Sequence, residues 1–102
     1  MTDVIEDVQI EEEIQETVLH PGKYKVIFMN DDVTPMDFVV EVLVQIFRHS
    51  DKTAQELTMS IHSKGSAVAG VYSYEIAEQK AVETTKISRE HGFPLQIAIE
   101  KE

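Results

Sequence analysis

The residues of this chain whose types could do chemistry are concentrated at positions 30–36, where the sequence reads Asn-Asp-Asp-Val-Thr-Pro-Met. Asn30, Asp31 and Asp32 carry amide and carboxylate oxygens, which accept hydrogen bonds and favour a cation. The same residue types also build turns, because Asn and Asp side chains bond to nearby backbone and Thr34 can cap a following helix. The segment is therefore either turn chemistry or a small acceptor-rich site.

A second candidate is His62, which falls beside Ile61 at the C-terminal end of a predicted helix and precedes Ser-Lys-Gly. A histidine at a helix end also has a structural explanation, because it complements the helix dipole. With Asp31 and Asp32 it would suit a divalent cation only if the three side chains converge, so a metal-dependent enzyme stays an alternative. Phosphate loops, His-Glu-x-x-His pairs and nucleophile elbows are absent from the sequence. We expect no catalytic residue, no metal and no cofactor.

Composition narrows the class of protein further. The chain has 102 residues, no cysteine and 42% hydrophobic residues, which fits one globular domain without disulfides or thiolate metal sites. Its net charge of −10 argues against nucleic acid, whose phosphates need a basic face. No apolar run reaches the roughly 18 residues of a membrane helix, and the acidic N-terminus does not look like a signal peptide. We therefore expect a cytoplasmic protein that does not enter membranes.

The charge is unevenly distributed along the chain. Residues 1–20 contain seven acidic residues and no Lys or Arg. The dipeptide Pro21-Gly22 follows and marks a turn before the domain. Like charges oppose compaction, so we expect residues 1–22 to form an acidic, mostly disordered N-terminal extension and residues 23–102 to form the folded domain. The extension is either a solubilising tail or a segment that docks on a partner.

Within the domain, hydrophobic periodicity alternates between the two-residue repeat of strands and the 3.6-residue repeat of helices. It predicts a strand from Lys23 to about Met29, helices over 35–48 and 50–65, a strand over 66–74, a helix over 75–91 and a strand over 94–101. The order β-α-α-β-α-β predicts an α+β two-layer sandwich with three helices and a three-stranded antiparallel sheet.

Helix boundaries carry signals of their own. Thr34 is the expected N-cap of the first helix, with Pro35 in its first position. Ser50 or Asp51 is expected to cap the second helix. Gly65 and Gly92 are expected to end the second and third helices, Gly65 in the left-handed conformation.

Taken together, these residues resemble the signature of the ClpS adaptor family. The resemblance covers residues 23–101 and rests on Tyr24-Lys25-Val26-Ile27, Asn30-Asp31-Asp32, Thr34-Pro35-Met36-Asp37-Phe38-Val39, His62, Gly65, Gly70-Val71-Tyr72, Ile76-Ala77-Glu78, Lys80 and Gly92-Phe93-Pro94-Leu95. It implies a non-enzymatic adaptor of the N-degron (N-end rule) pathway, which binds N-terminal Phe, Tyr, Trp or Leu of a substrate. It also implies delivery to a ClpA or ClpC-type AAA+ unfoldase with ClpP, and a fold like the C-terminal domain of ribosomal protein L7/L12.

The resemblance also assigns roles to single residues. Asn30, Asp32 and His62 are expected to contact the substrate α-amine, with Asp31 nearby or acting through water. The expected side-chain pocket comprises Met29, Thr34, Met36, Val39, Thr58, Ile61 and Leu95. Glu75 and Lys80 match positions that contact the N-terminal domain of the unfoldase, and the acidic extension matches a segment used in delivery. We expect the adaptor to act as a monomer.

One position departs from the family pattern. Thr58 stands where many relatives carry methionine, and it is shorter and β-branched. The pocket is therefore expected to be wider at that wall and to admit β-branched N-terminal residues. Besides the metal-dependent enzyme, a general interaction module of the ribosomal-stalk type, without a degron pocket, stays an alternative. A titration with free-amine and N-acetylated peptides separates the three.

Overall fold

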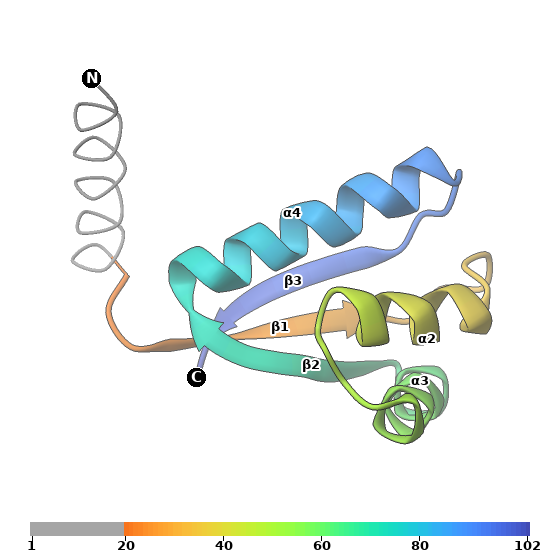
Figure 1. Ribbon diagram of the computed structural model, residues 1–102, viewed down its shortest axis with the longest axis horizontal. Coiled ribbons are helices and arrows are strands. Elements are labelled where there is room, and N and C mark those ends of the chain that lie inside the picture. Colours follow the sequence, from red (N-terminus) through yellow and green to blue (C-terminus); the bar gives the residue numbers. More distant parts are fainter. Residues whose placement is uncertain (1–19) are drawn as a thin grey trace.

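The computed structural model of the protein describes residues 20–102 and contains three helices and three strands (Figure 1). The elements are β1 (Lys23–Met29), α2 (Met36–Gln45), α3 (Asp51–Lys64), β2 (Ser66–Ser73), α4 (Tyr74–Glu90) and β3 (Gln96–Lys101). This order confirms the predicted α+β fold. The expectation of disorder in the acidic extension falls mainly on residues 1–19, which lie outside the described residues.

The sheet has the strand order β2-β1-β3, and both pairings are antiparallel. Val26, at the middle of β1, pairs with Gly70 on one side and Ile99 on the other. The next pair on the β2 side is Ile27 with Val68, so Ala69 is an extra residue and forms a bulge. The central strand β1 leads directly into the Asn-Asp-Asp segment, which is thereby attached to the most extensively paired strand.

Helix α4 packs across all three strands, while α2 packs on α3 and α3 packs on β2. Figure 1 shows α2 and α3 gathered near the end of the sheet at which β1 stops. The shared core includes Phe28 and Leu43, both fully buried. Each such side chain stabilises the fold by about 1.5–3 kcal/mol. Among residues 20–102, no helix combines the length and the apolar character needed to cross a membrane.

Two predicted helix boundaries of α2 are wrong. The N-cap position is Pro35, in extended conformation and without a side-chain cap. The Thr34 hydroxyl is turned toward the Asp31 carboxylate, to which it donates at 2.8 Å. The helix ends at Gln45 rather than Arg48, and Arg48 has a φ of +61°, which a right-handed helix cannot contain. The Lys80 ammonium donates to the Ile46 carbonyl at 2.7 Å and so satisfies a carbonyl at this helix end.

The boundaries of α3 agree with the sequence. The Ser50 side chain accepts the Thr53 N–H at 3.1 Å and caps the helix. Gly65 closes the helix with a φ of +92°, and its N–H donates to the Ile61 carbonyl at 2.9 Å. The Gly65 carbonyl in turn accepts the Asn30 N–H at 2.9 Å. The end of α3, which carries His62, is therefore tied to the residue that follows β1.

Candidate functional site

The loop after β1, the helices α2 and α3 and the residue before β3 enclose one pocket of about 210 Å³. Its lining contains all eleven residues for which the sequence suggested a role in binding a substrate. These residues are Met29, Asn30, Asp31, Asp32, Thr34, Met36, Val39, Thr58, Ile61, His62 and Leu95. The structure thus brings the predicted set together, and the ligand that each residue contacts stays a prediction.

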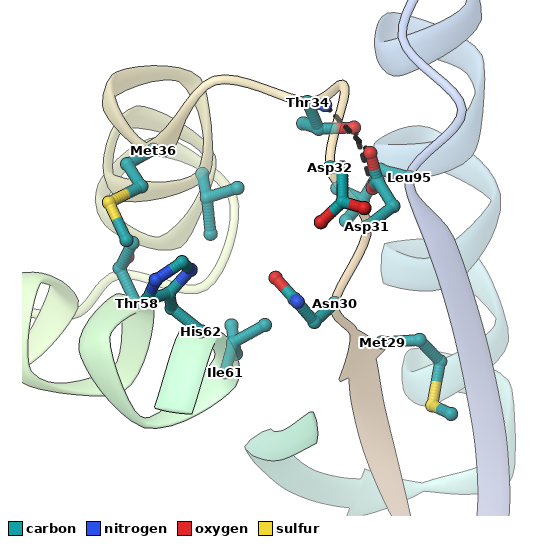
Figure 2. Close-up of a pocket in the computed structure, with 11 residues that line it drawn as sticks. Met29, Asn30, Asp31, Asp32, Thr34, Met36, Thr58, Ile61, His62 and Leu95 are labelled. Carbon is teal, nitrogen blue, oxygen red and sulfur yellow. Dashed lines mark hydrogen bonds between the residues drawn. The ribbon is translucent and has the colours of Figure 1, made fainter. Parts of the chain in front are cut away.

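The pocket has two facing walls (Figure 2). The loop wall consists of Asp31, Asp32 and Thr34 together with Leu95, which precedes β3. The helix wall consists of Met36 and Val39 on α2 and Thr58, Ile61 and His62 on α3. In Figure 2, Asn30 lies between the two walls, and Asp32 and His62 face each other across the gap.

Asp31 shapes the loop wall from within. One carboxylate oxygen accepts the N–H groups of Val33 and Thr34 at 2.8 and 2.7 Å, and the other accepts the Thr34 hydroxyl at 2.8 Å. Burial would raise the pKa of Asp31, but these hydrogen bonds and the charge of Arg89 outweigh it and lower the pKa. The turn interpretation of the sequence therefore applies to Asp31, whose carboxylate oxygens are already hydrogen-bonded.

Asn30, Asp32 and His62 form a polar rim around the opening of the pocket. All three are exposed, and their side chains make no hydrogen bond to other residues within 20–102. In Figure 2 the three side chains point toward the space between the walls. An amide oxygen, a carboxylate and an imidazole nitrogen can together accept three hydrogen bonds from one cationic donor group.

Below the polar rim, the pocket is apolar. Val39, Ile61 and Leu95 are 6%, 5% and 1% exposed. Thr58 is equally buried, and its hydroxyl donates to the Ala54 carbonyl one turn earlier at 2.8 Å, so it needs no partner from a ligand. Met36, at 38% exposure, adds a flexible apolar side chain to the opening. The pocket is suited to one apolar group that carries a cationic donor at its outer end.

A metal site is not formed by these groups. In the part of the chain that the structure describes, no three His, Asp or Glu side chains lie together in a way that could hold a metal ion. Asp31, Asp32 and His62 therefore do not converge as the metal-dependent alternative requires.

Residues 19–98 match the protein family described as "ATP-dependent Clp protease adaptor protein ClpS". This chain belongs to the ClpS family. It is 43% identical over 91 residues to the ClpS adapter of Sodalis glossinidius, covering 89% of this chain and 86% of that protein. It is also 43% identical over 88 residues to the adapter of Treponema denticola, covering 86% and 87%. As a member of this adaptor family, it is a Clp protease adaptor and not an enzyme.

A solved structure supports the same membership. The structure of Agrobacterium tumefaciens ClpS2 bound to L-phenylalaninamide matches with a TM-score of 0.78 and 46% sequence identity. The match covers 80% of this chain and 99% of the ClpS2 chain. The α+β arrangement described above is therefore the ClpS fold.

The two residues predicted to contact an unfoldase lie elsewhere, on α4. Glu75 is in the first turn and half-buried, and neither Glu75 nor Lys80 lines the pocket. Lys80 bonds the Ile46 carbonyl and lies over the rings of Phe47 and Tyr72, with its Nζ 5.7 and 5.3 Å from their centroids. Its ammonium thus already has a role within the domain.

Sequence reasoning missed two supporting side chains. His49 follows α2, and its ring bonds the carbonyl of the bulged residue Ala69. Arg89 lies in the last turn of α4, and its guanidinium donates to the carbonyls of Phe93 and Leu95. No local signal marks His49, because its partner is 20 residues away.

Proposed function

We propose that this adaptor binds the free N-terminal residue of N-degron substrates when that residue is Phe, Tyr, Trp or Leu. It then delivers them to a ClpA or ClpC-type AAA+ unfoldase for degradation by ClpP. The observation that carries the proposal is the pairing of the polar rim with an apolar pocket of about 210 Å³. A protein N-terminus has two parts that match these: an ammonium group for the polar rim and an adjoining side chain for the apolar pocket.

The chemistry of an N-terminus explains how such a site discriminates. A protonated α-amine has a positive charge and three donors, and Asn30, Asp32 and His62 offer one acceptor each. An internal peptide N–H has one donor and no charge, so it leaves acceptors of the site unpaired. The related Agrobacterium tumefaciens protein is bound to L-phenylalaninamide, which combines a free α-amine with a phenyl ring.

The test is a titration of the full chain with a short peptide that begins with Phe and with its N-acetylated twin. Acetylation removes the charge and two of the three donors, so we expect affinity to fall by about 100-fold or more. Equal binding of both peptides, or binding of neither, would refute the proposed recognition.

Delivery needs surfaces beyond the pocket, and we assign it to Glu75, Lys80 and the acidic extension. Glu75 is half-buried in the first turn of α4, and His20 stacks on the neighbouring Tyr74 with ring centroids 3.8 Å apart. The point at which the extension joins the domain is therefore next to the proposed unfoldase surface.

Removing residues 1–19 tests the role of the extension and keeps His20 in place. Peptide affinity is expected to stay unchanged, while degradation of an N-degron reporter by the reconstituted unfoldase and ClpP slows. A truncated chain that delivers at the wild-type rate would reduce the extension to a solubilising tail.

A further inference from the structure

Leu95, which lines the pocket on the loop wall, is held by a side chain that lies outside the pocket. Arg89, in the last turn of α4, donates from one guanidinium nitrogen to the carbonyls of Phe93 and Leu95, each at 2.9 Å. Leu95 is 1% exposed and lines the pocket, whereas Arg89 does not line it. One side chain therefore connects the end of α4 to the backbone of a pocket residue.

The loop between α4 and β3 has separate supports at its two halves. Gly92 ends the helix with a φ of +77°, the Phe93 N–H donates to the Ser88 carbonyl at 2.8 Å, and the Phe93 ring packs on Phe38 with centroids 5.0 Å apart. These contacts fix the first half of the loop. The second half, from Phe93 to Leu95, is held by the two Arg89 hydrogen bonds.

Arg89 also acts on the other segment of the loop wall. Its charge is one of the influences that lower the pKa of Asp31, whose carboxylate organises residues 31–34. The Arg89 charge thus acts on the Asp31 turn, while its two hydrogen bonds hold the backbone of Phe93 and Leu95. Because Arg89 itself is exposed, each of its bonds is worth less than a buried one.

We propose that Arg89 is a positioning residue for substrate recognition: it fixes Leu95 in the pocket by holding the loop backbone and does not touch the ligand. The inference rests on the proposed recognition of N-terminal residues and adds a residue to it. Leu95 belongs to the apolar interior and not to the polar rim. Arg89 therefore acts on the part of the pocket that is proposed to hold the side chain of the N-terminal residue.

The first experiment compares Arg89→Met with Lys86→Met. Both variants remove one positive charge from α4, but Lys86 is exposed and makes no hydrogen bond to the loop before β3 among residues 20–102. We expect Arg89→Met to bind the Phe peptide about fivefold more weakly and Lys86→Met to stay within about twofold of wild type. Equal affinities of the two variants would overturn the proposal. Thermal unfolding of both variants verifies that they are folded at the assay temperature.

A double-mutant cycle then separates positioning from a general loss of charge or stability. If Arg89 acts through Leu95, the fivefold effect of Arg89→Met should shrink to about twofold in a Leu95→Val background. Val is used because truncation of a fully buried Leu to Ala costs about 2–5 kcal/mol and risks unfolding. Full additivity of the two substitutions would show that Arg89 does not act through Leu95.

The wild-type titration distinguishes a failure of this inference from a failure of the proposed function. A wild-type chain that binds the Phe peptide while Arg89→Met binds equally well refutes the inference alone. A wild-type chain that binds neither peptide refutes the proposed function. The NMR methyl resonances of Leu95 then test the clamp, which is the pair of hydrogen bonds from Arg89 to the carbonyls of Phe93 and Leu95. They are expected to shift in Arg89→Met and not in Lys86→Met, and unshifted resonances in both would refute the clamp.

Discussion

The loop wall and the helix wall of the pocket are held by different kinds of interaction. The loop wall depends on bonds between a side chain and nearby backbone, since Asp31 accepts from residues two and three positions later. The helix wall depends on periodicity, which places Thr58, Ile61 and His62 on one face of α3. Neighbouring residues of the loop wall can therefore have unrelated roles, while those of the helix wall share one face of α3.

Asp31 and Asp32 show this difference most clearly. They are adjacent and chemically identical, but three hydrogen bonds hold the carboxylate of Asp31 within the turn, while that of Asp32 is exposed on the polar rim. One carboxylate is structural and the other is available to a ligand. Substitutions in each wall can test whether this division is real.

The largest effect is expected from Asp32→Ala and His62→Ala, one from each wall. Each would remove a proposed charge-assisted bond to the ammonium group, worth about 2–3 kcal/mol or about a 30- to 150-fold loss of affinity for the Phe peptide. Because both side chains are exposed and make no bond within the described residues, the melting temperature should barely change. Glu56→Ala, an exposed acid on α3 outside the pocket, controls for net charge. Wild-type affinity in both variants would show that the polar rim does not bind the amine.

Asp31→Ala should have a smaller effect on binding and a larger one on stability. The substitution removes three local hydrogen bonds, so residues 31–34 lose their turn and Asp32 its position. We expect about a tenfold loss of peptide affinity with a lowered melting temperature. Titration and thermal unfolding, run beside Asp32→Ala, measure both. An Asp31→Ala variant that behaves like Asp32→Ala would contradict the division between the two carboxylates.

Thr58→Met should change selectivity more than affinity. Thr58 is 4% exposed on the helix wall, so a longer side chain there must occupy space in the pocket or displace Met36. We expect peptides that begin with Ile or Val to lose about fivefold relative to the Phe peptide. Thr58→Val keeps the branched shape and removes only the bond to Ala54, so its Ile-to-Phe ratio should match wild type. An unchanged ratio in Thr58→Met would mean that this position does not set the width of the pocket.

The smallest expected effect concerns acid stability. The pKa of Asp31 is lowered below its ordinary value of 3.8 in the folded state. Its ionised form therefore stabilises the fold fully above that value, and the contribution is lost as pH falls through the folded-state pKa. The difference in unfolding free energy between wild type and Asp31→Asn should thus shrink below about pH 3.8. Asp32→Asn is the matched control. If its difference in unfolding free energy from wild type shrinks over the same pH range, the hydrogen bonds of Asp31 do not explain the effect.

Much of this architecture could be predicted because its signals are local. The element order follows from periodicity, and the cap at Ser50 and the helix ends at Gly65 and Gly92 follow from the conformations that those residues favour. The resemblance to ClpS adaptors likewise nominated the eleven residues that line the pocket. Their roles toward a ligand are still predictions.

The errors and omissions involve partners that are distant or in competition. Thr34 is predicted to cap α2, but its side chain is turned toward the Asp31 carboxylate, to which the hydroxyl donates. Helix α2 ends three residues before the predicted end at Arg48, and the Ile46 carbonyl at this end is bound by Lys80, 34 residues away. The loop clamp by Arg89 also depends on where Gly92 turns the chain. Sequence periodicity contains no information about such pairings.

The position of β1 in the middle of the sheet also sets an order of events during synthesis. Its partner β3 is adjacent in the sheet but distant in the sequence, since Tyr24 pairs with Lys101. The two strands can therefore pair only after β3 has been synthesised. Leu95 lies in the segment just before β3. A growing chain that has reached the end of α4 already contains the polar rim, but the apolar pocket still lacks one side. The ability to hold a side chain is therefore expected to arise at the same moment as sheet closure, which makes folding and readiness to bind a single event.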